Sequence, residues 1–272
     1  MPELPEVETV KEKLKPRLLN KKINMVTAYW PNILANKTVI EFENDIKNQY
    51  ILDIKRRGKW LIFELTSNYL LVHLRMEGKF FFKSKKESKE KHEHIIFELD
   101  DTTLRFNDVR KFGKMYLLDK DDIYSKRPLN ELGLEPFDSS LDIDYLKTKY
   151  LKKNKPIKEV LLDQKIVAGI GNIYADEILF LSNINPLKKA NKLSDRELSN
   201  IIVNTKKILE SAIKMGGTTI RSYVSLDDKK GMFQGELNVH RREGLECHIC
   251  GSLVIKIKVG GRGTYYCPTC QK

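Results

Sequence analysis

The positions of apolar residues divide the chain into a strand-rich first half and a helical second half. Between residues 38 and 118, short segments rich in β-branched or aromatic residues alternate with turn pairs such as Arg57-Gly58 and Phe112-Gly113. Many short strands at this spacing predict a β-sandwich or a barrel. The predicted strands are 38–43, 50–54, 59–65, 69–74, 79–82, 94–99, 103–106 and 114–118.

Helical periodicity is found before and after these strands. Apolar residues recur at spacings of three and four from Val7 to Leu18, so an amphipathic helix is predicted. Pro5 suits the first turn of this helix, whereas Pro16 predicts a kink or an early stop. In the second half, helices are predicted at 142–152, 157–162 and 172–182, and a capping box at 194–197 opens a longer helix that ends at Gly216-Gly217.

A Gly-Leu-Glu-Pro-Phe-Asp segment at 133–138 marks a domain boundary, because strands stop before it and helices begin after it. We therefore expect an α+β protein. Its predicted parts are an N-terminal β-sandwich domain flanked by helices at 1–132, a linker at 133–140, a helical domain at 141–235 and a zinc ribbon at 236–272. The segment 83–92, in which lysine alternates with serine and glutamate, is predicted to be a solvated hairpin loop rather than a phosphate-binding one.

The predicted ribbon rests on the cysteines, all of which lie in the last part of the chain. Their spacing is C-x2-C, sixteen residues, and C-x2-C, which suits four thiolates around one zinc ion. We expect a structural ion, since most such sites leave no coordination position open for catalysis. The predicted ligands are Cys247, Cys250, Cys267 and Cys270.

The charge of the chain points to a polyanionic partner. The net charge is +12, and the Lys and Arg residues are distributed over the whole 272-residue chain. This distribution favours a folded basic face over a basic tail. A ribosomal protein or a membrane-surface protein could also be this basic, but a protein that binds nucleic acid is the preferred interpretation. The sequence contains no apolar run of about 18 residues and no signal-peptide pattern, so we expect a cytoplasmic protein without a membrane partner.

The first residues could carry covalent chemistry. If Met1 is removed, the chain begins with the secondary amine of Pro2, which forms a positively charged iminium with a carbonyl-like carbon without needing a proton. Glu3 is adjacent and could transfer protons, and the positive end of the helix dipole would favour the neutral amine. An ordinary amphipathic helix with an acidic first turn is the alternative.

The sequence Pro-Glu-Leu-Pro-Glu-Val-Glu-Thr at 2–9 resembles the amino terminus of the formamidopyrimidine-DNA glycosylases, a bacterial 8-oxoguanine repair family. Further motifs extend the resemblance, in order, over essentially the whole chain. It implies a monomer, associated with the bacterial nucleoid, that binds damaged double-stranded DNA through a helix-two-turn-helix domain and a zinc ribbon. The implied activity is that of a bifunctional glycosylase and abasic-site lyase, with Pro2, Glu3, Lys59 and Arg262 as catalytic residues.

The resemblance also implies residues that hold the DNA and fill the space left by a flipped base. The DNA contacts would be His73, His92, Arg110, Lys153, Lys158 and Asn172, and the space would be filled by Met76, Arg110 and Phe112. From the residues alone, Met76 and Phe112 would be core side chains. Asn172, which follows a Gly-Ile-Gly turn, is predicted to cap the next helix.

Lesion recognition is assigned by the resemblance to a segment that leaves a helix through glycines, and to two glutamates. The residues concerned are Glu6, Glu77, Thr218, Thr219, Ile220, Arg221 and Tyr223. A helix C-cap followed by a connector explains the same segment equally well.

The sequence departs from the family pattern at one place before the ribbon. Val239-His240-Arg241-Arg242 replaces the Val-Tyr-Gly-Arg that relatives usually carry, so that a tight glycine turn is missing.

Two alternatives stay open at this point. An enzyme similar to endonuclease VIII would share the proline chemistry but prefer oxidised pyrimidines, although Leu4 and the set of Met76, Arg110 and Phe112 favour the purine enzyme. A non-catalytic zinc-ribbon protein that binds DNA would share the architecture without the chemistry.

Overall fold

A computed structural model describes residues 1–218 and 231–272. The chain forms two compact units. The first unit comprises Met1–Asn130 together with Thr218 and Gly231, and the second comprises Glu131–Gly217 and Met232–Lys272.

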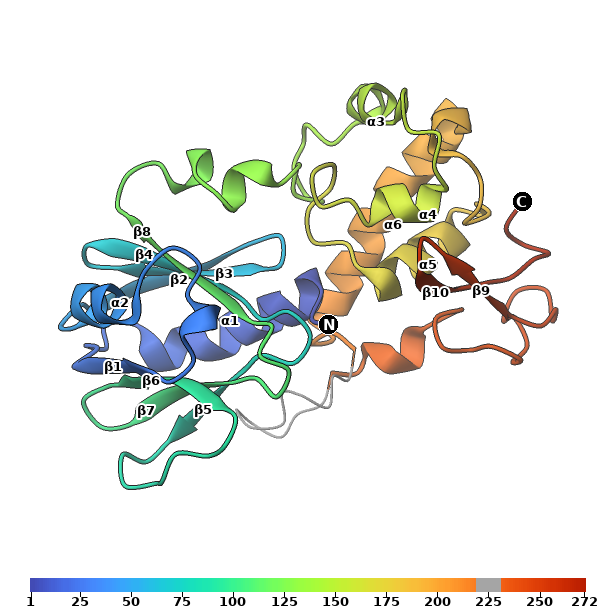
Figure 1. Cartoon of the computed structure of the whole chain (residues 1–272). Coiled ribbons are helices and arrows are strands. Elements are labelled where there is room, and N and C mark those ends of the chain that lie inside the picture. The colour runs from blue at the N-terminus through green and yellow to red at the C-terminus, as the bar shows by residue number, and fades with distance from the viewer. Residues whose placement is uncertain (219–230) are drawn as a thin grey trace. The chain divides into compact units, whose positions relative to one another are not determined.

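The first unit is built on two antiparallel sheets (Figure 1). One has the strand order β2-β3-β4-β8, with β2 at Ile51–Arg57, β3 at Trp60–Leu65, β4 at Asn68–His73 and β8 at Lys114–Asp119. The other has the order β1-β6-β7-β5, with β1 at Met25–Ala28, β6 at Glu93–Glu98, β7 at Thr103–Asn107 and β5 at Lys79–Lys83. Side chains from both sheets share one apolar core, so the predicted sandwich is confirmed.

Helix α1 (Leu4–Leu18) packs on β2 and β3 through the apolar stripe that its periodicity predicts. Its N-cap is Glu3, which forms a capping box with Glu6. Pro16 lies inside the helix, which ends two residues later at Leu18. Proline inside a helix removes one backbone hydrogen bond to the carbonyl four residues earlier, and the end at Leu18 agrees with the early stop that Pro16 predicts.

The strand predicted at 38–43 is wrong. Residues Val39–Ile46 form helix α2, which Thr38 opens with a capping box to Glu41. The β-branched residues that suggested a strand lie at the helix start, where the Thr38 hydroxyl accepts a hydrogen bond from the Glu41 backbone. A strand that was not predicted from the sequence, β1, pairs with β6 instead.

The lysine-rich segment 83–92 is exposed as expected, but it is not a hairpin loop. It joins β5 to β6, and these two strands lie on opposite sides of β7. The segment therefore crosses the end of β7. A buried guanidinium holds it there, because Arg105 on β7 donates hydrogen bonds to the backbone carbonyls of Ser84, Glu87 and Ser88.

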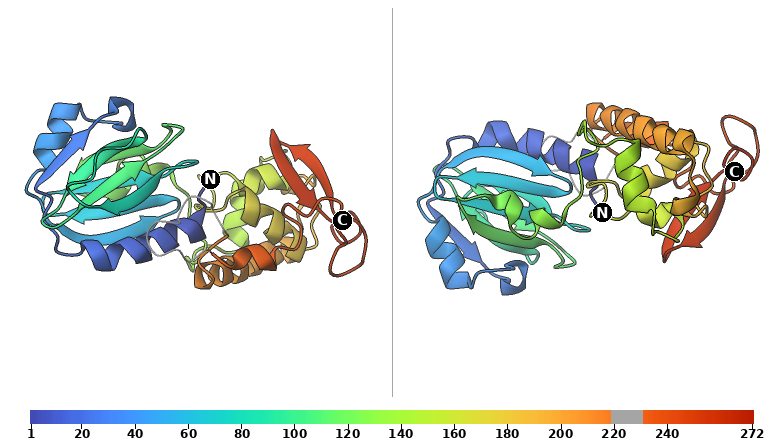
Figure 2. Two further views of the ribbon diagram at one scale, coloured as in Figure 1. Left: turned by 90° about the horizontal axis from the view of Figure 1, so that it is seen from below. Right: turned by 90° about the horizontal axis from the view of Figure 1, so that it is seen from above.

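The second unit contains the predicted helices and the ribbon. The helices are α3 (Ile143–Tyr150), α4 (Ile157–Leu161), α5 (Asn172–Leu181) and α6 (Asp195–Lys214), and the ribbon strands are β9 (Ile255–Val259) and β10 (Arg262–Tyr266). Helix α5 packs against both α6 and β10, and Figure 2 shows the ribbon, in red, beside these helices. The capping box that opens α6 is present, as the sequence predicts. Short 3-10 turns lie at Pro31–Ile33, Ile123–Ser125, Leu129–Glu131, Ala190–Lys192 and Phe233–Glu236.

The predicted linker begins with residues that are firmly packed in the second unit. The Gly133 amide donates to the Gln164 carbonyl at 2.8 Å, and a Cβ atom on Gly133 would lie 2.1 Å from the Ile166 carbonyl oxygen. Only glycine fits such a close approach of two backbones.

Among the described residues, no helix has both the length and the apolar character needed to cross a bilayer.

Candidate functional site

The start of helix α1 gathers the acidic residues next to Pro2. Pro2 and Glu3 are buried, and the Glu3 amide donates to Glu6 Oε2 at 2.9 Å. The other oxygen of Glu6 accepts from the Thr218 amide at 2.9 Å and from its hydroxyl at 3.2 Å. Glu6 therefore ties the start of α1 to residue 218, where the predicted lesion-recognition segment begins. Its other predicted members, Thr219, Ile220, Arg221 and Tyr223, lie outside the described residues.

Lys59 lies in the two-residue turn that joins β2 to β3, next to Gly58, whose φ of 57° lies in the left-handed region that favours glycine. The Lys59 side chain is buried, which is unusual for a lysine. A solvated strand edge, the alternative for this cationic segment, therefore does not describe Lys59.

His73 ends β4 with its ring buried edge-on against Trp60, at a centroid distance of 4.8 Å. Burial, followed by the charges of Arg75 and Lys59, lowers the pKa of His73 from 6.5 to about 3. The ring is therefore neutral, and its Nδ1 accepts from the Arg75 amide at 2.9 Å. His73 thus supports the turn after β4 as an acceptor and not as a cation.

Two turns of the first unit expose large apolar side chains. Met76 is 40% exposed and Phe112 is 48% exposed, so the core positions expected from residue type alone are wrong. Both turns rest on the same buried ring. A Cβ atom on either Gly78 or Gly113 would lie 2.7 Å from Phe106, so only glycine lets each turn come this close.

Asp108 organises the second of these turns. Its carboxylate is buried and accepts from the amides of Arg110, at 3.1 Å, and Gly113, at 2.7 Å. The Arg110 guanidinium lies over the Phe112 ring, 4.8 Å from its centroid, so the cation and the ring form one exposed group. Asp108 was not predicted from the sequence, although aspartate at the start of a turn is a common signal.

His92 directly precedes β6, and Glu77 lies between β4 and β5. The carbonyl of His92 accepts from the Asp108 amide at 3.0 Å, which fixes the end of the lysine-rich segment. Its ring Nδ1 is buried without a hydrogen-bond partner among the described residues. Glu77, in the turn that carries Met76, is partly exposed.

In the second unit, Asn172 is the first residue of α5 and not its cap. The N-cap is Gly171, which has no side chain with which to cap the helix. The Asn172 amide group instead donates to the Gly263 carbonyl at 3.0 Å, which ties the start of α5 to the ribbon strand β10.

The two predicted lysines differ in their surroundings. Lys153 is 41% exposed and lies 3.4 Å from Asp163. Lys158 is completely buried, and its ammonium forms an ion pair with Asp176 and lies 3.4 Å from the Asn172 carbonyl. Asp176 was not predicted, although its spacing of four residues from Asn172 places both on one face of α5.

Arg262 is exposed and is the first residue of β10, at the tip of the ribbon as predicted. The turn before it consists of Gly260 and Gly261, with φ values of 55° and 78°. A Cβ atom on Gly260 would lie 2.5 Å from the Glu159 side chain, so the tip packs closely on α4.

The four cysteines can hold a zinc ion. All are free, and their sulfur atoms lie within 4.8 Å of one another. Two of the separations are 3.9 Å, between Cys247 and Cys270, and 3.4 Å, between Cys250 and Cys267. Tetrahedral zinc with Zn–S bonds of about 2.3 Å requires sulfur atoms about 3.8 Å apart, so the geometry fits. Four protein ligands leave no open position, and the ion is structural.

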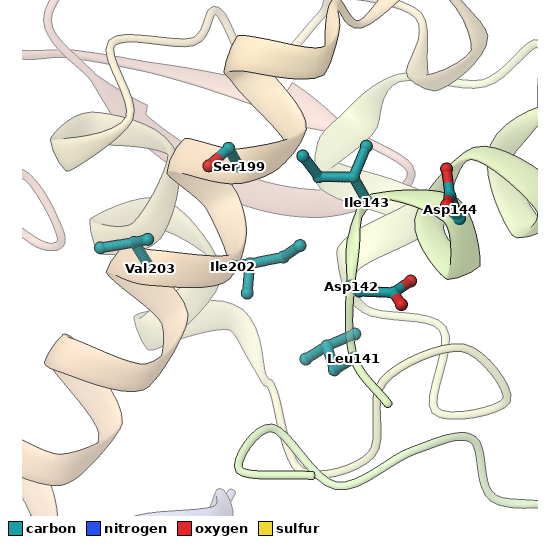
Figure 3. Close-up of a pocket in the computed structure, with 7 residues that line it drawn as sticks. All are labelled: Leu141, Asp142, Ile143, Asp144, Ser199, Ile202 and Val203. Carbon is teal, nitrogen blue, oxygen red and sulfur yellow. The ribbon is translucent and has the colours of Figure 1, made fainter. Parts of the chain in front are cut away.

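A shallow pocket of about 350 Å³ lies elsewhere in the second unit, between the start of α3 and the exposed side of α6 (Figure 3). It contains none of the predicted site residues, and one of its carboxylates caps α3. The lining residues are Leu141, Asp142, Ile143, Asp144, Ser199, Ile202 and Val203.

The four-cysteine ribbon, the buried carboxylates at the start of α1 and the exposed side chains of the two turns fit a zinc-ribbon DNA glycosylase, and comparison with known proteins narrows the class. Residues 1–115 match the formamidopyrimidine-DNA glycosylase N-terminal domain, 132–224 the H2TH domain of the same enzyme, and 244–272 a zinc finger found in FPG and IleRS. The formamidopyrimidine-DNA glycosylase of Oceanobacillus iheyensis is 47% identical over 100% of this chain and 98% of its own, and that of Listeria monocytogenes is 44% identical over 100% of both.

Solved structures agree with these matches. A complex of a Lactococcus lactis FPG variant with DNA that contains Fapy-dG has a TM-score of 0.94 and 39% identity, with all of both chains covered. A complex of the Lactococcus lactis Fpg with DNA that contains an abasic site has a TM-score of 0.93 and 39% identity, with 99% of each chain covered. The chain belongs to the formamidopyrimidine-DNA glycosylase family.

Proposed function

We propose that this protein is a base-excision repair enzyme that removes oxidised purines from double-stranded DNA and then cuts the abasic strand. It acts as a monomer and carries one structural zinc ion. The arrangement that best supports the proposal is the start of α1, where Pro2 lies beside buried Glu3 and where Glu6 is bonded to Thr218. An ordinary amphipathic helix has no need of buried carboxylates at its first turn.

The proposed reaction begins after Met1 has been removed. The Pro2 nitrogen attacks C1′ of the flipped nucleotide, the bond from C1′ to the base breaks, and the base leaves with a proton. The sugar ring opens to an iminium on Pro2, which withdraws electrons from C2′ and so acidifies it. Loss of a C2′ proton expels the 3′ phosphate, and a second elimination expels the 5′ phosphate. Glu3 and Lys59 move the protons, and Arg262 assists the last elimination while contacting a phosphate.

The remaining predicted residues divide into three groups in this proposal. Met76, Arg110 and Phe112 fill the space of the flipped nucleotide, and their exposure supports this role. Glu6, Glu77 and the segment that begins at Thr218 recognise the lesion. The contacts to DNA are made by His73, His92, Arg110, Lys153, Lys158 and Asn172, of which His73 acts as a neutral ring that supports a turn.

The proposal also includes the location of the protein and the limits of its domains. We infer a bacterial cytoplasmic enzyme associated with the nucleoid, because its substrate is the chromosome. The proposed domains are the sandwich at 1–132, a linker at 133–140, the helical domain at 141–235 and the ribbon at 236–272.

Oxidised pyrimidines are a second candidate substrate class. One solved structure similar to this chain is described as the wild-type Lactococcus lactis enzyme in complex with DNA that contains an oxidised pyrimidine, at 38% identity and a TM-score of 0.92. A comparison of cleavage rates on duplexes with 8-oxoguanine and with thymine glycol separates the two. We expect the 8-oxoguanine duplex to be cleaved faster.

Borohydride trapping tests the proposed chemistry directly. The purified protein, shown by mass spectrometry to begin at Pro2, is incubated with an 8-oxoguanine duplex and sodium borohydride, which reduces the iminium to a stable adduct. We expect a covalent complex, and we expect Pro2→Gly to lower its yield at least about a hundredfold, since a secondary amine is lost. Binding without any adduct would instead identify a non-catalytic DNA-binding protein, and equal trapping by Pro2→Gly would remove Pro2 from its role.

A further inference from the structure

A buried ion pair lies beneath the end of the lysine-rich segment of the first unit. Arg105 is 2% exposed and Glu93 is fully buried, and their side chains meet at 2.9 Å. Arg105 donates to the Ser88 carbonyl at 3.1 Å, and Glu93 accepts from the Glu90 amide at 2.9 Å. The backbone is therefore fixed on both sides of Lys89, although Lys89 itself is exposed.

Two exposed lysines at this place have their ammonium groups over aromatic rings. The Lys89 ammonium lies 4.8 Å from the centroid of the Tyr29 ring, and the Lys111 ammonium lies 3.8 Å from the centroid of the Trp30 ring. The two rings come from consecutive residues, and the Tyr29 amide is bonded to the His94 carbonyl at 2.8 Å. A ring on one side of an ammonium restricts its position and leaves the other side open to a further partner.

The same region is bonded to the turn at 108–113, which carries the exposed Arg110 and Phe112 side chains. The Asp108 amide donates to the His92 carbonyl at 3.0 Å, and the Asp108 carbonyl lies 2.9 Å from His94 Nε2. The end of the lysine-rich segment and this turn are therefore joined directly. In the proposed function the turn enters the base stack, so the backbone of the duplex passes close to it.

The exposed charges around this junction are positive. The carboxylate of Glu90 forms an ion pair within the segment, and that of Asp108 is buried and accepts from backbone amides. A solvated loop, which the sequence favours for 83–92, has no need of a buried ion pair beneath it or of rings beside its lysines. We call the exposed ammonium groups of Lys89, Lys91 and Lys111 the basic edge.

We propose that the basic edge binds the phosphate backbone of duplex DNA beside the point where the turn at 108–113 enters the base stack. This inference rests on the proposed function and adds to it a contact that is made with undamaged as well as damaged DNA. A phosphate carries no information about sequence or lesion, so the contact contributes equally to the affinity for every duplex. Cations that are already held in place lose little conformational freedom on binding.

The first test removes two charges of the basic edge and measures affinity for DNA over a salt series. Each protein is given an undamaged duplex and the same duplex with a tetrahydrofuran abasic analogue. We expect Lys89→Gln/Lys111→Gln to weaken binding of both duplexes about five- to thirtyfold and to reduce the salt slope by about two. The control, Lys47→Gln/Lys120→Gln, has the same net charge and changes exposed lysines that follow α2 and β8. It should stay within about twofold of the unchanged protein.

The second test asks whether the Tyr29 ring places the ammonium. Tyr29→Leu removes the ring and Tyr29→Phe keeps it, and the side chain is 48% exposed, so neither substitution should affect folding. We expect Tyr29→Leu to weaken binding about two- to fivefold, and Tyr29→Phe to weaken it less than about 1.5-fold. In a Lys89→Gln background, Tyr29→Leu should have no further effect, because the cation that it places is already absent. A full effect in that background would contradict the placing role of the ring.

Three outcomes would overturn the proposal: an unchanged salt slope, an equal loss in the control variant, or a loss confined to the damaged duplex. The last would show that the lysines act through the turn and not through phosphates. If thermal melts show that Lys111→Gln disturbs the fold, Lys89→Gln/Lys91→Gln carries the same prediction.

Borohydride trapping by the unchanged protein separates this inference from the proposed function. Absence of an adduct would contradict the proposed chemistry, whereas the losses of affinity described above would still support the basic edge as a DNA contact. Normal trapping together with an unchanged salt slope in the variant would contradict the basic edge alone.

Discussion

The two units differ in the kind of side chain that they expose or bury at the places proposed to meet DNA. The turns of the first unit expose apolar side chains, Met76 and Phe112, over a scaffold whose main members are an apolar ring, Phe106, and a neutral histidine, His73. The start of α5 in the second unit buries its charges, with Lys158 and Asp176 paired out of contact with water. The turns of the first unit expose apolar side chains to solvent, whereas the start of α5 in the second unit keeps an ion pair in the interior.

This difference follows from the part of DNA that each region is proposed to meet. A base stack is apolar on its faces, so side chains that enter it must be large and must already be exposed before binding. A phosphate is a charge with defined geometry, and it is bound best by donors that cannot move. Exposure costs little for two side chains, whereas a buried charge requires a complete set of partners.

Loss of zinc is expected to have the largest effect and to act on the second unit alone. Chelation under reducing conditions, or Cys250→Ser, should unfold the ribbon that carries Arg262, because structural zinc contributes about 10 kcal/mol or more in small zinc domains. DNA affinity should fall at least about a hundredfold through the lost phosphate contacts. Hydrogen exchange should show the sandwich strands still protected. Full affinity in metal-free protein would contradict a structural role for the ion.

Substitutions of two phenylalanines in the first unit test whether its exposed side chains contribute to the stability of the fold. Phe106→Ala empties the buried site beneath both turns and should destabilise folding by about 3–5 kcal/mol. Phe112→Ala, which removes the same group from an exposed position, should change the unfolding free energy by less than about 0.5 kcal/mol. Excision of 8-oxoguanine should nevertheless slow in Phe112→Ala. Similar destabilisation by both substitutions, in denaturant titrations, would show that Phe112 is part of the core.

The neutral state of His73 should make folding sensitive to acid. Because its folded pKa of about 3 lies below the value of 6.5 for an unperturbed histidine, the unfolded chain takes up the proton first as the pH falls. Stability is therefore complete above pH 6.5 and is lost between pH 6.5 and 3, with this residue contributing at most about 1.4 kcal/mol per pH unit. His73→Asn, which keeps an acceptor for the Arg75 amide but does not titrate there, should show a shallower loss. An identical pH dependence would mean that the ring is accessible to protons when folded.

The smallest expected effect concerns Arg241, at the position where the family resemblance predicts a glycine turn. The tight turn is not lost in this chain, because Arg241 adopts a φ of 62° and the Arg242 amide still closes the turn on the Val239 carbonyl. Arg241→Gly should raise stability by at most about 1 kcal/mol, since it relieves the strain of a left-handed residue. Arg241→Val should lower stability by about as much, because β-branching is worst there. Equal melting temperatures for the two variants would contradict this account.

Much of the architecture was decided by local order in the sequence. The cysteine spacing was sufficient for the zinc site, and the Ser194 capping box marked the start of α6. Pro2 and Glu3 are neighbours in sequence, so no folding is needed to bring them together. Capping, turn geometry and metal spacing act over a few residues, and this is why they can be read without a structure.

The tertiary structure decided which groups support these local motifs. Residues 39–46 became a helix although their composition suggested a strand, and Phe106 lay under two turns that the sequence keeps far apart. Neither Asp176 nor Arg105 could be recognised as an organising residue, because their partners come from other elements and burial alone gives those contacts their strength. A charge or a ring acquires such a role only when folding removes water and brings distant residues against it.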